Sequence, residues 1–173
     1  MKKEYEIEDT WVSYELHPET PPAGMLLSER FKGHDLSSFY EQLRARGLEV
    51  GVVFSNLKLL SNSRLALMAS EFARDQGMYH SFHENMFHAY FTEGLDIGNP
   101  DVIAAVAGKS GLDEKETRSA ILDGRYASRF DEARKEGQLI GLTGVPLFIV
   151  ENQYKIVGAQ PIEVFRDLFK KEL

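Results

Sequence analysis

The sequence changes character abruptly near Gly141, and this change limits the folds that the chain can adopt. From residue 61 to about residue 140, apolar residues recur at the spacing of four or five successive α-helices. Residues 145–150 then form a short β-rich run, 151–153 a polar turn and 154–158 a second run, which together predict a β-hairpin. Residues 161–169 predict a closing amphipathic helix with proline in its first turn. A helical block followed by a hairpin and a helix favours an α/β fold.

The first 60 residues add one predicted strand and one predicted helix. Residues 11–16 alternate in the period of a pleated strand, and the three prolines within 17–24 predict a loop without helix or strand. Residues 35–43 have helical spacing, and we expect that helix to end at Gly47.

The helical block contains recognisable starts and ends. The helix over 79–90 is expected to carry its large apolar side chains on one side; these are Tyr79, Phe82, Met86, Phe87 and Tyr90. Asn99 before Pro100 predicts one helix start, Asp113 predicts another, and Gly141 ends the last helix, over 126–140.

Length and composition point to one domain. A chain of 173 residues with 43% apolar residues can bury a core of its own, so we expect a single domain over 1–173 with a helical insertion at about 61–140. The net charge of −7 argues against nucleic acid and anionic membrane as partners. Because the N-terminus has no apolar region behind Lys2 and Lys3, and no apolar run is long enough for a membrane span, a cytoplasmic location is expected.

The chain contains no cysteine, which removes disulfides, thiolate metal sites and cysteine nucleophiles together. His80, His83, Glu84 and His88 lie on one predicted helix, but three histidines so spaced cannot all converge on one ion. The sequence therefore predicts no metal site and indicates no cofactor.

The last part of the chain resembles the second half of the thioredoxin superfamily. The resemblance lies in residues 141–150, Gly-Leu-Thr-Gly-Val-Pro-Leu-Phe-Ile-Val, and in the turn Gly-Ala-Gln-Pro at 158–161 before a helix. It implies a cis peptide bond between Val145 and Pro146. It also implies a substrate-binding segment made of Thr143, Gly144, Val145 and Pro146.

Residues 14–24, Tyr-Glu-Leu-His-Pro-Glu-Thr-Pro-Pro-Ala-Gly, and the segment from Phe87 to Asn99 resemble FrnE-like proteins of the DsbA family. These are related to 2-hydroxychromene-2-carboxylate isomerase, and the resemblance covers essentially the whole chain. It implies a thioredoxin-like fold with an inserted all-helical domain. The family activity that it implies is protein disulfide oxidoreduction, or a glutathione-dependent isomerisation.

The departure from the family is that its first strand and its Cys-x-x-Cys helix have no counterpart in this sequence. Because thiol–disulfide exchange needs a thiolate and a resolving thiol, we assign no catalytic residue and expect the chain as given to be redox-inactive. The alternative is a non-enzymatic module that binds a peptide or glutathione in the groove beside Pro146. Whether the gene encodes the strand and a Cys-x-x-Cys or selenocysteine motif upstream stays open.

The absent strand would leave a gap in the sheet, between the predicted strand at 11–16 and the one that follows Pro146. A partner chain, a re-paired sheet or an upstream polypeptide would each fill it. A homodimer is therefore a possible assembly.

Overall fold

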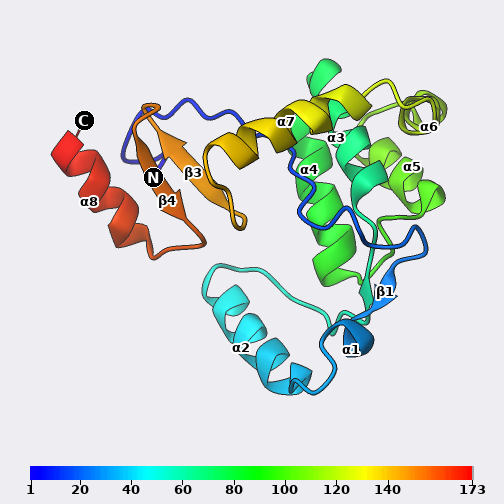
Figure 1. Cartoon of the computed structure of the whole chain (residues 1–173), viewed down its shortest axis with the longest axis horizontal. Helices are drawn as coiled ribbons and strands as arrows, with labels where there is room; N and C mark the ends of the chain where they lie inside the picture. Colours follow the sequence, from blue (N-terminus) through cyan, green and yellow to red (C-terminus); the bar gives the residue numbers. More distant parts are fainter. Residues whose placement is uncertain (173) are drawn as a thin grey trace.

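The computed structural model describes residues 1–172, with side chains as far as Lys171. The helices and strands, in chain order, are β1 (Met25–Leu26), α1 (Leu27–Arg30), α2 (Leu36–Glu49), β2 (Leu59–Leu60), α3 (Arg64–Asp75), α4 (Tyr79–Phe87), the π-helix η1 (His88–Thr92), α5 (Pro100–Lys109), α6 (Glu114–Leu122), α7 (Ala127–Leu139), β3 (Leu147–Val150), β4 (Tyr154–Val157) and α8 (Ile162–Glu172). Helices α3 to α6 gather at one end of the molecule, the hairpin with α8 lies at the other, and α7 runs between them (Figure 1).

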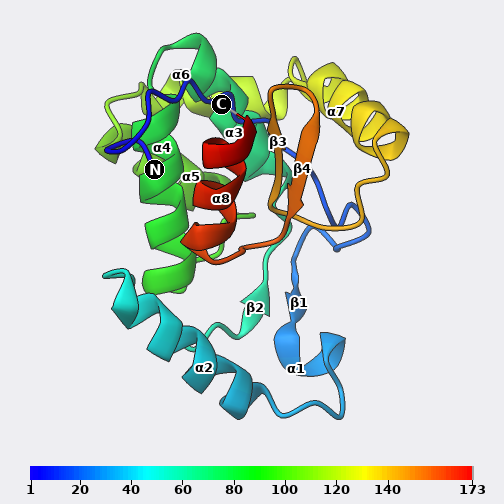
Figure 2. The same ribbon diagram turned by 90° about the vertical axis from the view of Figure 1, so that its left-hand side faces the viewer.

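The predicted hairpin and closing helix are confirmed. Strands β3 and β4 pair antiparallel, with Leu147 opposite Val157 and Val150 opposite Tyr154. Helix α8 covers one face of this hairpin (Figure 2). The Phe148 ring on β3 and the Phe165 ring on α8 meet edge to face, with 5.0 Å between their centroids. We call β3, β4 and α8 the hairpin lobe.

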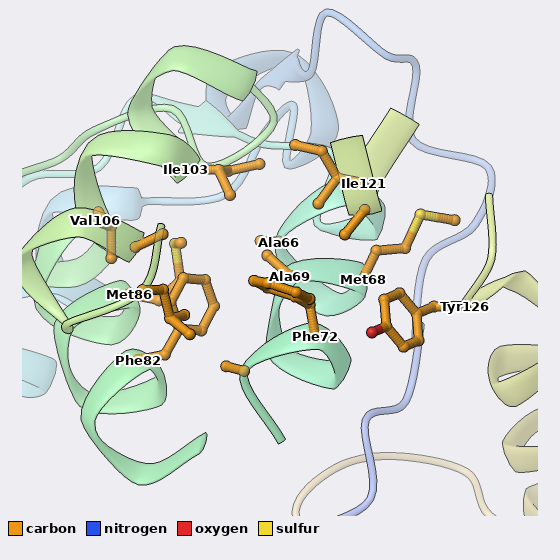
Figure 3. Packing of buried hydrophobic residues seen from close by; sticks show 14 of the residues in the cluster. Ala66, Met68, Ala69, Phe72, Phe82, Met86, Ile103, Val106, Ile121 and Tyr126 are labelled. Atoms are coloured by element: carbon orange, nitrogen blue, oxygen red, sulfur yellow. The ribbon is translucent and has the colours of Figure 1, made fainter. Parts of the chain in front are cut away.

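The core lies in the helical block, which we call the helical lobe (α3 to α6 with η1). Most of its fully buried side chains are small or branched, which lets the helices approach one another closely. Figure 3 shows the packing of this core around Phe72 and Phe82. Ala69, Ala73, Phe82, Ile103 and Ala107 are completely excluded from solvent. Most of the apolar burial therefore belongs to this lobe.

The helix boundaries in this lobe follow the predicted signals. The Asn99 side chain accepts a hydrogen bond from Asp101 N at the start of α5, and Asp113 accepts two at the start of α6. Helix α7 ends where Gly141 adopts φ of 70°, and Leu142 N donates back to Gly137 O.

The strand predicted over 11–16 is wrong, because these residues form no strand and pair with neither β3 nor any other strand within 1–172. An alternating pattern becomes a strand only where a neighbouring strand offers backbone partners. Here the Trp11 carbonyl accepts a hydrogen bond from Arg74 Nη2 at 2.6 Å instead. The segment is thus held by side chains of the helical lobe, and the possibility that it re-pairs with β3 is excluded.

The predicted helix end at Gly47 is also wrong, since α2 continues to Glu49 and the left-handed glycine that follows it is Gly51, with φ of 76°. Gly47 serves a different purpose. A Cβ at this position would lie 2.5 Å from the Val52 carbonyl oxygen and 2.7 Å from the Phe54 ring. The helix therefore needs a glycine there so that the returning chain can pack against it.

The short elements β1, α1 and β2 were not predicted. Strands β1 and β2 form a two-residue antiparallel pair, Met25 with Leu60 and Leu26 with Leu59. The strand and helix runs are too short to show a period.

Candidate functional site

The segment Thr143–Pro146 lies between two fixed ends. On one side the last turn of α7 closes at Gly141, and on the other side Pro146 leads directly into β3. The Pro146 carbonyl oxygen accepts a hydrogen bond from Gly158 N at 2.8 Å, which ties the segment to the turn after β4. The Val145–Pro146 peptide bond is cis in the structure.

Thr143 and Gly144 line a small hollow of about 60 Å³, whereas Val145 and Pro146 do not. The other walls of the hollow come from residues 140–142, Leu147, Lys155 and Val157. The Lys155 ammonium donates to the Ile140 carbonyl oxygen at 3.0 Å, so the hollow carries no unpaired cation among its described side chains. Val145 instead projects to the surface, with 49% of its area exposed. The structure thus brings the four predicted residues together in one segment but directs them to two different surroundings.

Strand β3 has one paired edge and one free edge. Because Pro146 accepts from Gly158, the alternation of an antiparallel ladder places Phe148 and Val150 in the positions that bond to β4. The N–H and C=O groups of Leu147 and Ile149 then point to the opposite edge. No strand within residues 1–172 pairs there.

The side chains along this free edge are apolar. Ile149 is 47% exposed and Phe148 is 37% exposed, and residues 139–150 contain no charged side chain. An exposed, uncharged strand edge is a template for adding another extended segment. The arrangement can therefore hold a ligand through backbone hydrogen bonds.

A second cluster, which sequence reasoning missed, surrounds the Glu71 carboxylate on α3. Ser13 Oγ donates to Glu71 Oε1 at 2.7 Å and Arg129 Nη1 donates to Oε2 at 3.0 Å. Arg74 Nε donates to the same Oε2 at 3.3 Å. Burial raises the pKa of Glu71, but the hydrogen bonds from Ser13, Arg129 and Arg74 outweigh it and leave the pKa below its usual value. Ser13 and Arg129 are each 58 residues from Glu71 in sequence, so no local spacing announces the cluster.

This cluster borders a hollow of about 220 Å³. Its walls are formed by residues 10–13, Glu71, Arg74, Arg129, Phe130 and Ala133. Both guanidinium groups already bind carboxylates, since Arg129 also donates to Asp75 at 2.9 Å. The cluster therefore fastens the segment 10–13 to α3 and α7.

The four residues weighed as metal ligands do not come together. The His83 ring contacts the Trp11 and Phe87 rings at tilted angles, whereas His88 points to Glu93, with 3.4 Å between Nδ1 and Oε1. Among the side chains of residues 1–171, no three histidine, aspartate or glutamate side chains are grouped as a metal site. In the same part of the chain, no helix has both the length and the apolar character needed to cross a membrane.

Comparison with known proteins agrees with this geometry. Residues 3–170 match the family described as DSBA-like thioredoxin domain. The uncharacterized protein YwbO of Bacillus subtilis is 26% identical over 168 residues, which cover 96% of this chain and 83% of that protein. The crystal structure of a probable DsbA oxidoreductase from Streptomyces coelicolor superposes with a TM-score of 0.83 at 21% identity, over 91% of this chain and 71% of that one.

The solved structure shows the fold, and the family match extends over nearly the whole length. The thioredoxin-like α/β fold expected from residues 141–161 is therefore confirmed, while the FrnE subgroup stays a prediction. This chain belongs to the DsbA-like thioredoxin domain family.

Proposed function

We propose that this chain is a DsbA-like binding module that does not exchange disulfides by itself and that holds an extended peptide along the free edge of β3. The observation that carries the proposal is the pair of outward-facing backbone groups at Leu147 and Ile149, next to the predicted binding segment Thr143–Pro146. An extended peptide would exchange hydrogen bonds with both residues and continue the hairpin as a third strand. The exposed side chains of Val145 and Ile149 would flank it.

The redox part of the proposal rests on chemistry. Disulfide exchange requires a thiolate that attacks a disulfide sulfur and a second thiol that resolves the mixed disulfide. None of the 173 residues is cysteine, and the five methionines form no disulfide. In an insulin-reduction assay with dithiothreitol, the chain should not raise the rate above that of dithiothreitol alone, and turnover would refute this part.

The binding part is tested with a proline placed on each outer edge of the hairpin. Ile149→Pro removes an N–H that points to the free edge of β3, so the ladder with β4 keeps its bonds. Val157→Pro is the matched control, because Val157 lies opposite Leu147 and its N–H points to the outer edge of β4. Both variants should keep the wild-type circular dichroism spectrum.

The probe is an uncharged, threonine- and valine-rich hexapeptide, titrated by calorimetry in parallel with glutathione. We expect the peptide to bind to the wild type and to Val157→Pro and to lose binding to Ile149→Pro. Equal binding to both proline variants would exclude the β3 edge. If Ile149→Pro still binds glutathione, the glutathione site likewise lies outside the β3 edge.

A second candidate function is thiol–disulfide oxidoreduction, which family membership favours. The thiols for it would have to come from another polypeptide segment, since this sequence supplies none. The nucleotide sequence directly upstream of the Met1 codon tests this candidate. An in-frame strand followed by Cys-x-x-Cys, or by a UGA-containing equivalent, would favour it over the binding module, and its absence would remove it.

A further inference from the structure

Four aromatic residues spaced four apart form a continuous row on one face of α4 and η1. They are Tyr79, His83, Phe87 and Phe91, and Trp11 joins the row from the N-terminal segment. The ring centroids are 5.7 Å apart for Tyr79 and His83, 4.2 Å for His83 and Phe87, and 5.5 Å for Phe87 and Phe91. The Trp11 ring lies 4.9 Å from His83. We call these five residues the aromatic row.

The row is not the buried side of the helix. The prediction that Tyr79, Phe82, Met86, Phe87 and Tyr90 share one side is wrong, because Phe82 and Met86 enter the core while Phe87 turns away from it. Phe87 is 52% exposed and Trp11 is 45% exposed. Two large ring surfaces on either side of His83 are therefore open to a ligand.

At one end of this row, an aromatic ring already contacts a cationic side chain of the chain itself. The Arg74 guanidinium lies over the Tyr79 ring, 4.3 Å from its centroid, and its Nη2 donates to the Trp11 carbonyl oxygen. A guanidinium over an aromatic face is held by the negative potential of the ring. Phe87 and Trp11 offer the same kind of face without a guanidinium of this chain over it among the described contacts.

The charge beside the open rings also favours a cation. Glu84 lies one turn before Phe87, so its carboxylate and the Phe87 ring share a helix face. Glu84 is exposed and forms no ion pair with the side chains that the structure describes, which end at Lys171. The chain as a whole carries a net charge of −7, which attracts basic partners and repels phosphate.

We propose that the Trp11, His83 and Phe87 part of the aromatic row binds arginine side chains of an extended basic peptide. One guanidinium would stack on Phe87 with Glu84 as its counter-charge, in the way that Arg74 stacks on Tyr79 with Glu71 as its partner. A second guanidinium, two residues along the extended peptide and on the same side of it, would stack on Trp11. This surface belongs to the helical lobe and needs no backbone pairing, so it is independent of the β3 edge.

The test uses the peptide acetyl-(Arg-Leu)₃-amide, with acetyl-(Glu-Leu)₃-amide as the charge-reversed probe. Binding is followed by calorimetry and by the fluorescence of Trp11, the one tryptophan in the sequence. Phe87→Leu keeps an apolar side chain of similar size and removes the ring. Phe39→Leu, on α2, is the matched control because Phe39 is 56% exposed and lies outside the row.

We expect the arginine peptide to bind, and Phe87→Leu to weaken it about 3- to 10-fold, the range for losing one cation–π contact. Glu84→Gln should weaken it by a smaller factor, and Phe39→Leu and Ile149→Pro should leave it unchanged. Equal binding of the glutamate peptide, or unchanged affinity in Phe87→Leu, would overturn the proposal. Self-association of the free chain that Phe87→Leu abolishes would also overturn it, because the occupant would then be a second copy.

Discussion

The buried carboxylate of Glu71 provides the sharpest test of how the N-terminal segment is held. Its side chain is only 8% exposed, and it accepts hydrogen bonds from Ser13 on that segment and from Arg74 and Arg129 on α3 and α7. Glu71→Gln preserves shape and one acceptor oxygen but removes the charge. A buried hydrogen bond to a charged group contributes about 1.5–3 kcal/mol, and two of the three donors here are partly solvated guanidiniums whose share is smaller. We therefore expect the free energy of unfolding to fall by about 2 kcal/mol at pH 7.

The effect should depend on pH with a definite sign. Burial raises the pKa of Glu71, but the bonds from Ser13, Arg129 and Arg74 more than offset this and keep it below the usual 4.5. A carboxyl with a lowered folded-state pKa stabilises the protein above its unfolded-state pKa, and this stability is lost as the pH falls through the folded value. The difference between wild type and Glu71→Gln should thus be largest near neutral pH and shrink below pH 4.5.

Urea unfolding followed by Trp11 fluorescence and by far-UV circular dichroism measures this difference. Asp75→Asn is the control, because the Asp75 and Arg129 side chains are 39% and 40% exposed, and an ion pair so solvated contributes less than about 1 kcal/mol. Trp11 fluorescence should report unfolding at lower urea in Glu71→Gln than in Asp75→Asn. Equal stability of Glu71→Gln and wild type at pH 7, or a difference that does not change with pH, would refute the argument.

Three further outcomes follow from single features of the structure. Burial, and next the charge of His80, lower the pKa of His83 below 6.5, although Glu84 opposes them, so the protonated imidazole should quench Trp11 fluorescence with a midpoint below pH 6.5. Stability should also decrease as the pH falls through this range, because the unfolded state takes up the proton first. His83→Gln should abolish both changes. Glu151 and Asn152 have φ of 50° and 56° at the hairpin turn, so the double change Glu151→Asn and Asn152→Gly should raise stability by about 1 kcal/mol in thermal unfolding, and a lower melting temperature would contradict this. The unpaired β3 edge predicts self-association at micromolar concentration, and a clean monomer in sedimentation velocity would speak against it.

Local chemistry accounts for what the sequence could predict of the fold. Asn99, Asp113 and Gly141 act on backbone groups within three or four residues of themselves, so their effect on helix ends needs no knowledge of the rest of the molecule. The hairpin is equally local, since a polar turn joins its two apolar runs. The segment Thr143–Pro146, by contrast, was selected through the resemblance of residues 141–150 to the thioredoxin superfamily, and its binding role stays a prediction.

The errors arise where a distant partner decides the outcome. Residues 11–16 have a strand pattern, but Arg74 donates to the Trp11 carbonyl oxygen and Glu71 accepts from the Ser13 hydroxyl. These contacts hold the segment on the helical lobe, away from any strand. Gly47 suggested a helix end because glycine is common just after the last turn of a helix. The structure gives another reason for the glycine, since Val52 and Phe54 pack so closely against the helix that a Cβ would not fit. The side of α4 that faces the core could not be chosen between Phe82 and Phe87 without knowing where α3 and α5 lie.

The contacts that hold segment 11–13 on the helical lobe also affect the candidate sites. Because the helical lobe binds segment 11–13 through Arg74 and Glu71, that segment does not reach β3, and the backbone of Leu147 and Ile149 keeps its free edge. The same attachment places the Trp11 ring against His83, and this contact extends the aromatic row beyond α4. These contacts on α3 therefore support the aromatic row, so loosening them through Glu71→Gln should lower affinity for the arginine peptide at the row. Binding at the β3 edge uses the backbone of Leu147 and Ile149 and should persist, because Arg74 still holds the Trp11 carbonyl oxygen in this variant. The two sites are thereby separated in a single variant.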